Sequence, residues 1–399
     1  MSTNTVVVIG GGVIGLSTAY HLARKKAGRI VLVEKGPVGD GSSSRAAGIT
    51  SGLLWSETGV AARRIGIRWF EELSSELEGY TYHNEHGCLN LYSAEQWAKQ
   101  EGLLSFYDRL GAPYEVLDAA AVRRRWPALA PASDHVGLLD PTGGYSEPPE
   151  YIAALTRRIR DLGVNVEEGR KVIDFRMDRD RVTGVLTEND VLEADAVVCA
   201  VHAWGSTLLK RLRWQIPVKY FVHQRYVTSP LTDTLAWPPV NANSHAGYIR
   251  PASGNRVLIG ASTPDREEYR VESLDFHMSE LATPISVRDE AAHRLAMLVP
   301  ALAPVTWESE HVGLVAFSLD QEPVVGAVDQ LPGLYIGASF HSGGFSYNTA
   351  VGLLLAECIV DGRTSIDISA FSANRFEDAE VDEHLAKTLR QRDMENRRH

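Results

Sequence analysis

The chain has 399 residues, of which 44% are hydrophobic and 23% are charged, and its formal net charge at pH 7 is −11. This length favours two domains, and the composition is that of an ordinary globular protein. The negative net charge argues against nucleic acid and against an anionic membrane surface as partners.

The first segment of the chain predicts a strand, a glycine turn, a helix and a second strand. The apolar run 5–9 is followed by the glycine-rich stretch 10–15, by a helix-like stretch at 16–23, and by the apolar run 29–33, which ends at Glu34. Apolar runs separated by glycines in this order are typical of a βαβ unit.

The glycine spacing in this unit is the spacing that a dinucleotide requires. Gly10 permits the tight turn, Gly12 lets the backbone approach a pyrophosphate, and Gly15 lets the helix lie close to the sheet. The exposed N–H groups and positive dipole end of the helix favour phosphate. An acid about 20 residues further on, here Glu34, accepts hydrogen bonds from ribose hydroxyls. We therefore predict a dinucleotide-binding site, with a ligand-free structural unit as the alternative.

A polar segment rich in small residues follows at 39–48. It leads directly into the apolar stretch 49–55, which a flexible linker seldom does. We expect its backbone and hydroxyl groups to lie against a flat ligand.

The middle of the chain predicts a helix followed by short strands. From Pro148, apolar residues recur at helical spacing as far as Gly163, which predicts a helix over 148–162. Strands are expected at 164–166, 172–175, 182–186 and 194–200.

The pattern changes after Pro217. Longer alternating runs at 219–228 and 248–260 predict strands of an antiparallel sheet. A helix-like stretch follows at 281–298, interrupted early by Pro284.

A second strand–glycine–helix unit lies near the C-terminal end. It consists of a strand at 333–338, the pair Gly343-Gly344 and a helix at 348–360, and it would bring another helix N-terminus to the ligand. A nicotinamide enzyme seldom needs this second unit, whereas a tightly held flavin often does. The charged stretch 375–399 is expected to be an exposed helix or a frayed tail.

The three cysteines, Cys88, Cys199 and Cys358, are far apart and show no metal-binding spacing. They fit buried thiols in a reducing cytoplasm, so we expect a cytoplasmic protein without a metal site. The N-terminal apolar run lacks the basic start of a signal peptide, and no apolar run approaches the ~18 residues that cross a bilayer.

Together these motifs resemble the D-amino-acid oxidase superfamily of FAD-dependent oxidoreductases, in the branch of sarcosine and dimethylglycine oxidases and glycine oxidase. The resemblance covers nearly the whole chain. Besides the N-terminal unit with Glu34, it is carried by 41–48, Gly143-Gly144, 172–175 with 182–185, 196–200 with Trp204, 216–218 with His223-Gln224, Asp320, 323–326 and 343–345.

The resemblance implies an α/β fold in which a Rossmann-like FAD-binding domain of the glutathione-reductase type receives an inserted, antiparallel substrate domain. The FAD-binding domain is expected to be discontinuous, over 1–80, 140–215 and 326–399. The substrate domain is expected over 81–139 and 216–325.

The resemblance also implies which residues contact FAD. Glu34 matches the residue that holds the adenosine ribose, and Val172 the backbone contact to adenine. The stretch 43–45 matches residues beside the flavin, and 343–345 the loop and helix start that face the isoalloxazine. The full expected set is Gly10, Gly12, Val13, Ile14, Gly15, Glu34, Lys35, Ser42, Ser43, Ser44, Arg45, Ala47, Gly48, Val172, Ala200, Trp204, Gly343, Gly344, Phe345 and Ser346.

Five positions depart from the family pattern, one of them His202, which replaces a small residue that is usual before Trp204. Arg45 stands where dimethylglycine enzymes carry the histidine that binds flavin covalently, and Gly313 where monomeric sarcosine oxidases use a cysteine, so we expect non-covalent FAD. Val315 and Ser346 replace the arginine and the lysine that clamp the substrate carboxylate in glycine oxidase and sarcosine oxidase. A simple amino acid is therefore in doubt as substrate.

His223 and Tyr248 match pocket residues of the dimethylglycine enzymes and are the candidate catalytic residues, with Arg250. His223 would lower the amine pKa or accept its proton, and Tyr248 would position the substrate. Arg250 shares the strand face of Tyr248 and would either pair with an anionic substrate group or brace the sheet. His341 is expected to line the pocket or to be structural.

The expected function is oxidation of a C–N bond in an amine or amino-acid-like substrate, with oxygen or another carrier as final electron acceptor. The alternatives are oxidation of a hydroxy acid or alcohol on the same scaffold, and a flavin-binding subunit of a larger redox complex.

Overall fold

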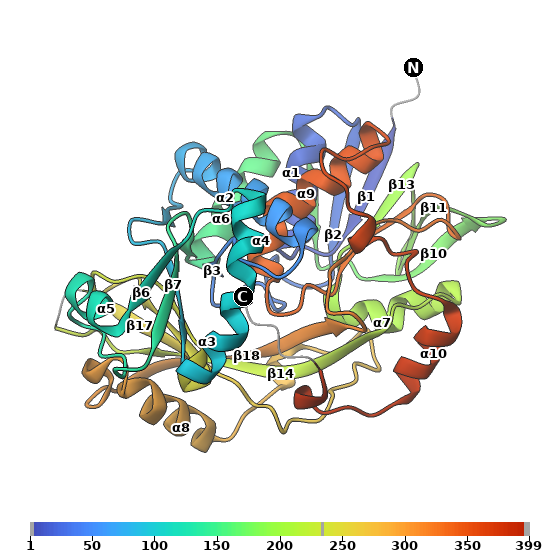
Figure 1. Cartoon of the computed structure of the whole chain (residues 1–399). Helices are drawn as coiled ribbons and strands as arrows, with labels where there is room; N and C mark the ends of the chain where they lie inside the picture. Colours follow the sequence, from blue (N-terminus) through green and yellow to red (C-terminus); the bar gives the residue numbers. More distant parts are fainter. Residues whose placement is uncertain (1–3, 233–234, 395–399) are drawn as a thin grey trace.

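The computed structural model describes residues 4–232 and 235–394, which are built around two large β-sheets (Figure 1). The first has six strands in the order β19-β20-β13-β1-β2-β9, and its neighbours are parallel except β19 and β20. Its central strands are almost wholly buried apolar runs because helices and a second sheet cover its two faces. Its strands are β1 (Thr5–Ile9), β2 (Arg29–Glu34), β9 (Asn165–Glu168), β13 (Ala196–Cys199), β19 (Val324–Ala327) and β20 (Leu334–Ala338).

Helices cover one face of this sheet. The pair α1 and α9, central in the upper half of Figure 1, pack against each other, with α6 beside α1 and α2 beside α9. Gly352 allows this close approach, since a Cβ there would lie 2.3 Å from the hydroxyl of Ser17. The helices are α1 (Val13–Arg24), α2 (Glu57–Glu76), α6 (Pro148–Asp161) and α9 (Gly344–Val360).

A small antiparallel sheet packs on the other face, where Phe175 and Val182 meet the strand residues Val7 and Val197. Its strands are β10 (Val172–Asp178), β11 (Arg181–Thr187) and β12 (Val191–Glu193).

The second large sheet has eight strands in the order β18-β14-β17-β16-β15-β5-β7-β6 and occupies the lower half of Figure 1. All its neighbours are antiparallel except β15 and β5. Its strands are β5 (Cys88–Tyr92), β6 (Glu115–Asp118), β7 (Val136–Asp140), β14 (Val218–Thr228), β15 (Val240–Ala242), β16 (Gly247–Ala252), β17 (Arg256–Ala261) and β18 (Trp307–Ser318).

Two helices, α5 (Ala119–Arg125) and α8 (Ile285–Ala296), bury their apolar sides against one face of this sheet. The opposite face is left to line a cavity. The remaining elements are β3 (Ile49–Thr50), β4 (Tyr82–His83), β8 (Gly144–Ser146), α3 (Ala94–Gln100), α4 (Leu104–Leu110), α7 (Gly205–Leu208) and α10 (Asp378–Ala386).

Most expected elements are present, and two differ. The single strand expected over 248–260 is the hairpin of β16 and β17, because residues 253–255 turn and Asn255 adopts a φ of +57°. The helix expected over 348–360 begins earlier, at Gly344. Within the expected tail, α10 forms after a capping box of Glu377 and Glu380, and residues 395–399 lie outside the described part. The proposed division into domains stays a prediction.

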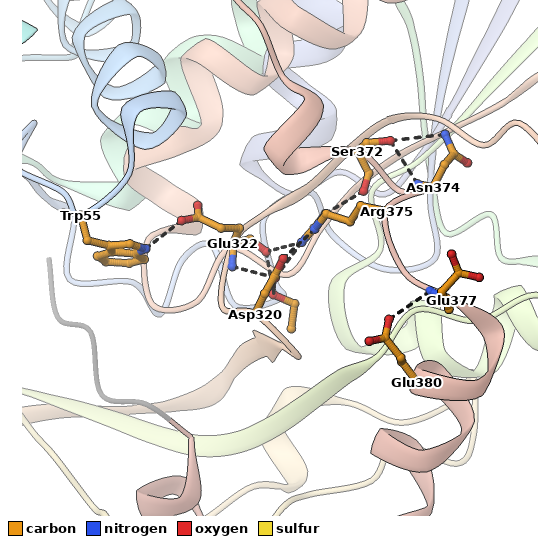
Figure 2. Close-up of polar contacts among 9 residues, drawn as sticks. Trp55, Asp320, Glu322, Ser372, Asn374, Arg375, Glu377 and Glu380 are labelled. Carbon is orange, nitrogen blue, oxygen red and sulfur yellow. Dashed lines mark hydrogen bonds and ion pairs between the residues drawn. The ribbon is translucent and has the colours of Figure 1, made fainter.

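The segment after α9 returns to the turn between β18 and β19. Arg375 donates to both carboxylate oxygens of Asp320, at 2.8 and 2.9 Å (Figure 2). In the same cluster, Trp55 Nε1 donates to Glu322 Oε1 at 2.7 Å. The C-terminal part of the chain is thereby fixed to the core before it reaches α10.

In the described residues, no helix is both long and apolar enough to cross a membrane. The same residues contain no group of three or more histidine, cysteine or acidic side chains arranged to hold a metal ion.

Candidate cofactor and substrate site

A single cavity collects residues from both ends and from the middle of the chain. It runs between the six-stranded sheet, the loop 40–48 and the eight-stranded sheet. Every residue of the expected cofactor set lines it except Gly15 and Ser44. His223 and Tyr248 line it as well, whereas Arg250 does not.

The turn from β1 into α1 leaves backbone facing this cavity. Gly10 has a φ of +104°, and a Cβ there would lie 2.6 Å from the carbonyl oxygen of Ala200. A Cβ on Gly15 would lie 1.9 Å from the carbonyl oxygen of Gly10, so Gly15 serves the packing of the turn and not the cavity wall. The N-cap residue of α1 is Gly12, which has no side chain to cap the helix. Instead, Ser43 Oγ accepts from Val13 N–H at 3.0 Å.

Glu34 closes the end of β2 beside this turn. Its two carboxylate oxygens accept from Gly11 N–H at 2.8 Å and Gly36 N–H at 2.9 Å. Burial raises the pKa of Glu34. The carboxylate keeps acceptor capacity for a further donor, as the proposed ribose contact requires.

Lys35 lines the cavity next to Glu34, but its ammonium is engaged with protein. It donates to the carbonyl oxygens of Leu274 at 2.8 Å and Phe276 at 2.6 Å, and lies 4.3 Å from the centre of the Trp204 ring. Trp204 Nε1 donates to the same Phe276 carbonyl at 2.9 Å. Lys35 and Trp204 thus hold the segment 274–276 over this end of the cavity.

The opposite end of the cavity is formed by the start of α9 and the loop before it. Gly344 and Phe345 line it, and the N-cap residue of the helix, Gly343, has no side chain that could cap it. His341 also lines it, with a φ of +57° and its ring centre 4.1 Å from that of Phe317. The Ser346 hydroxyl donates to the carbonyl oxygen of Ile49 at 2.6 Å, so it ties α9 to β3.

Two buried arginines of the eight-stranded sheet brace the loop 40–48. Arg225 on β14 donates to the carbonyl oxygens of Arg45 at 3.0 Å and Ser44 at 2.8 Å. Arg250 on β16 donates to the carbonyl oxygen of Ala47 at 2.6 Å. Burial lowers the pKa of Arg225 to about 10, so it stays charged at neutral pH.

The remaining donors of Arg250 are engaged by Glu147 and by Pro251. Its two terminal nitrogens reach the two carboxylate oxygens of Glu147 at 2.7 and 2.9 Å, and its side chain is fully buried. Of the two roles considered for Arg250, these contacts are the ones expected of the bracing role, and its role as a substrate anchor stays a prediction. The Glu147 carboxylate takes the bidentate pairing that Arg250 would otherwise offer to an anionic group of a ligand.

His223 and Tyr248 meet on the cavity wall. Tyr248 Oη lies 3.1 Å from His223 Nε2, and the two rings stack with their centres 5.8 Å apart. Gly260, opposite Tyr248 in the register of β16 and β17, permits this arrangement. A Cβ on Gly260 would lie 2.0 Å from Tyr248 Cζ, because the phenol ring crosses β17 on its way to β14.

Gly313 lies opposite His223 in the register of β14 and β18. A Cβ there would lie 3.3 Å from Arg45 Cδ, so the alkyl part of Arg45 passes over this glycine. The Arg45 guanidinium turns back to Asp40 and to the carbonyl oxygen of Gly41. Val315, two residues further on β18, gives the cavity an apolar wall.

Sequence reasoning missed Arg225, Gly260, Asn241 and Gln391, of which the last two line the cavity. The visible signal for Asn241 and Arg225 was a polar residue inside an otherwise buried strand. Gln391 lies in the segment expected to be a tail, and its position depends on tertiary contacts.

The family profile described as FAD dependent oxidoreductase (DAO) matches residues 5–358. The chain belongs to this family of FAD-dependent oxidoreductases. The resemblance drawn from the motifs and the expected α/β fold are thereby confirmed.

Curated relatives of this family member share about a quarter of its residues. The glycine oxidase of Geobacillus kaustophilus (strain HTA426) is 28% identical over 93% of this chain and 96% of the relative. The 4-methylaminobutanoate oxidase (formaldehyde-forming) of Paenarthrobacter nicotinovorans is 27% identical over 93% of this chain, which spans 45% of that relative's length.

Solved structures show the same fold. L-proline dehydrogenase from P. horikoshii superposes with a TM-score of 0.84 at 23% identity, over 93% of this chain and 96% of that one. Glycine oxidase from Geobacillus kaustophilus gives 0.80 at 25% identity, over 94% and 100%.

The cavity of this FAD-dependent oxidoreductase fits the family cofactor. Glu34 and Val172 lie at the end that suits adenosine, and the helix start after Gly12, beside Ser43, suits the pyrophosphate. Gly344 and Phe345 line the end that suits the ring. When bound, FAD supplies the two-electron acceptor for hydride transfer.

Proposed function

We propose that this protein oxidises the C–N bond of an amine or amino-acid-like substrate, using FAD held without a covalent bond. The observation that carries the proposal is the His223–Tyr248 pair on the cavity wall formed by the eight-stranded sheet, in the same cavity as the start of α9. A substrate held between this pair and the start of α9 would present its carbon to the cofactor ring and its nitrogen to the pair.

The reaction removes a hydride from the carbon next to nitrogen and a proton from the nitrogen, and leaves an imine. Water then adds to the imine, which divides it into a carbonyl compound and an amine or ammonia. The nitrogen must be neutral before hydride loss, because an ammonium has no lone pair to donate. His223 is placed to accept the proton from the substrate nitrogen. The transfer is direct or passes through Tyr248, whose Oη lies 3.1 Å from His223 Nε2.

Non-covalent FAD is supported by the two positions where the family attaches flavin. Gly313 has no side chain to attach, and Arg45 is engaged with Asp40. We expect acid precipitation of the protein to leave all the flavin in the supernatant, and flavin that stays with the pellet would contradict this part of the proposal.

Among residues 4–232 and 235–394, the cavity offers no ready clamp for a simple amino acid. At the two positions where the family places carboxylate anchors, Val315 is apolar and Ser346 donates to Ile49. In the described part of the chain, the lysines and arginines that line the cavity all have partners in the protein: Lys35, Arg45, Arg170 and Lys171. We therefore propose a substrate whose recognition does not depend on a side-chain cation.

The experiment that tests the function is anaerobic mixing of the FAD-loaded protein with N-methyl and primary amino acids, larger amines and hydroxy acids. Flavin bleaching near ~450 nm by one amine class is the expected result. Readmitted air then separates an oxidase from a dehydrogenase. Bleaching by hydroxy acids alone, or by no compound, contradicts the proposal, and the second outcome favours a flavin-binding subunit.

A further inference from the structure

A row of polar side chains crosses the cavity face of the eight-stranded sheet. In the registers of β7, β5, β15 and β16, Leu138 lies opposite Asn90, Asn90 opposite Asn241, and Asn241 opposite Tyr248. Residues directly opposite in neighbouring strands project to the same face. Asn241 therefore stands beside Tyr248 on the wall where the amine is proposed to bind, and it lines the cavity.

Hydrogen bonds along this row determine which way each amide faces. The carbonyl oxygen of Leu138 can only accept, so the group of Asn90 that lies 3.3 Å from it is Nδ2. Asn90 Oδ1 is then the atom that faces Asn241, and it accepts from Asn241 Nδ2 at 2.9 Å. Asn90 is almost fully buried, which protects this order from exchange with water.

The second hydrogen of Asn241 Nδ2 is directed toward Cys88 Sγ, at 3.9 Å. Both donors of the amide are thus committed to the protein. Within residues 4–232 and 235–394, Oδ1 of Asn241 receives no hydrogen bond. The amide therefore offers the cavity an acceptor and no donor.

We propose that Asn241 Oδ1 accepts a hydrogen bond from the N–H of the substrate, which makes Asn241 a specificity-determining residue for primary and secondary amines. This inference rests on the proposed function and narrows its substrate class. A neutral tertiary amine has no N–H to donate. A carboxylate or ether oxygen can only accept a hydrogen bond, so it forms none with the amide oxygen, which is also an acceptor. With Asn241 holding the N–H, the nitrogen lone pair stays directed away from the amide.

The test compares an amine with the ether in which oxygen replaces its N–H, for example N-methylbenzylamine and benzyl methyl ether. Dissociation constants come from the concentration dependence of anaerobic flavin reduction for the amine, and from the shift of the flavin absorption band for the ether. The FAD-loaded proteins compared are wild type, Asn241→Leu, Asn241→Asp and the control Asn189→Leu. Asn189 lies in the turn between β11 and β12, outside the cavity.

We expect wild type and Asn189→Leu to bind the amine about tenfold more tightly than the ether, the worth of one hydrogen bond. Asn241→Leu should lose this preference because its amine affinity falls while its ether affinity does not. A preference that persists in FAD-loaded Asn241→Leu overturns the inference.

Asn241→Asp keeps the shape and the acceptor and adds a negative charge. A carboxylate beside the amine favours its protonated form, so the pH profile of flavin reduction should move to higher pH by about one unit or more. An unmoved profile overturns the inference even if Asn241→Leu fails to fold. If no amine reduces the wild-type flavin, the proposed function fails. The dissociation constant of the amine is then measured from the shift of the flavin absorption band, as for the ether, so the difference between amine and ether binding still tests Asn241.

Discussion

At the scale of single residues, two glycines are important because their lack of a side chain leaves space for other groups. Gly260 leaves room for the Tyr248 ring to cross β17, and Gly12 leaves the start of α1 open beside Ser43. Neither position has a positive φ, so their role is space and not backbone conformation. Each can be tested by adding a side chain.

Gly260→Ala should separate Tyr248 from His223. The new Cβ would occupy the position of the phenol ring, whose Cζ lies 2.0 Å away, so the ring must leave and the hydrogen bond with His223 is lost. We expect amine affinity to fall about tenfold with FAD content unchanged, measured by anaerobic flavin reduction. Gly102→Ala is the control because nothing lies within 4 Å of its Cβ position. Equal affinities in the two variants would remove Tyr248 from the substrate site.

Gly12→Val should abolish flavin binding. Its Cβ would lie 3.0 Å from Ser43 Oγ, and its methyl groups would fill the space that the pyrophosphate needs at the start of α1. The purified variant is expected to be folded by circular dichroism but colourless, whereas Gly102→Val stays yellow. A fully loaded Gly12→Val protein would contradict the placement of the pyrophosphate.

At the scale of elements, the loop 40–48 belongs to neither large sheet and is held by helix α1 and by the eight-stranded sheet. Ser43 caps α1, while Arg225 and Arg250 reach its carbonyl oxygens from β14 and β16. The sheet that carries the substrate wall therefore also holds the loop that would lie beside the cofactor. Removing either arginine side chain should lower the affinity for FAD as well as the free energy of unfolding.

Arg250→Met leaves Glu147, whose side chain is only 12% exposed, without its charged partner, and we expect a loss of about 3 to 5 kcal/mol in the free energy of unfolding at pH 7. FAD affinity should fall too, because the Ala47 carbonyl loses its donor. Urea unfolding and flavin titration measure the two effects. Stability within 1 kcal/mol of wild type at neutral pH would contradict the bracing role.

The same pair makes this loss depend on pH. Burial raises the pKa of Glu147, but the charge and hydrogen bonds of Arg250 and the N–H of Ser253 outweigh it, and the pKa lies below its usual value. A carboxylate with a lowered folded pKa stabilises the protein above its unfolded pKa of about 4.3 and loses that contribution as pH falls through the folded pKa. The stability difference between wild type and Arg250→Met should therefore be largest at neutral pH and narrow below about pH 4.

At the scale of the whole molecule, the C-terminal segment packs back against the eight-stranded sheet. Lys219 on β14 donates to the carbonyl oxygens of Leu385 and Lys387 and pairs with the buried Glu268 at 2.7 Å. Further on, Leu389 accepts from Glu268 N–H, and Gln391 N–H donates to Arg266. The segment then brings Gln391 to the cavity and buries Met394 against Phe221 and Phe317.

Ending the chain after Ala386 should open the substrate side of the cavity and spare the cofactor side. Removing Met394 alone forfeits about 2 kcal/mol of buried apolar contact. We expect a lower melting temperature, unchanged FAD content and a several-fold weaker amine affinity. Arg390→Gln with Arg392→Gln is the control, since these side chains pair with Glu267 and Asp265 outside the cavity. Unaltered amine affinity in the shortened chain would show that the segment does not contribute to the substrate site.

The local order of apolar runs and glycines was enough to predict the N-terminal βαβ unit and the second strand–glycine–helix unit, whose helix begins at Gly344 and not at the predicted residue 348. These features depend on neighbours within about 30 residues, where periodicity and turn chemistry dominate. The family and its cofactor followed from the same motifs, because the turn that would hold the pyrophosphate is itself local.

The substrate wall was decided by tertiary structure. His223, Asn241, Tyr248 and Gly260 become neighbours only through the register of four strands, and Gln391 arrives from the far end of the chain. Arg250 has the residue type and the strand face expected of a substrate anchor. It forms an ion pair with Glu147, however, which lies about a hundred residues away in the chain. Register and long-range pairing set which side chain meets which, and no local pattern encodes them.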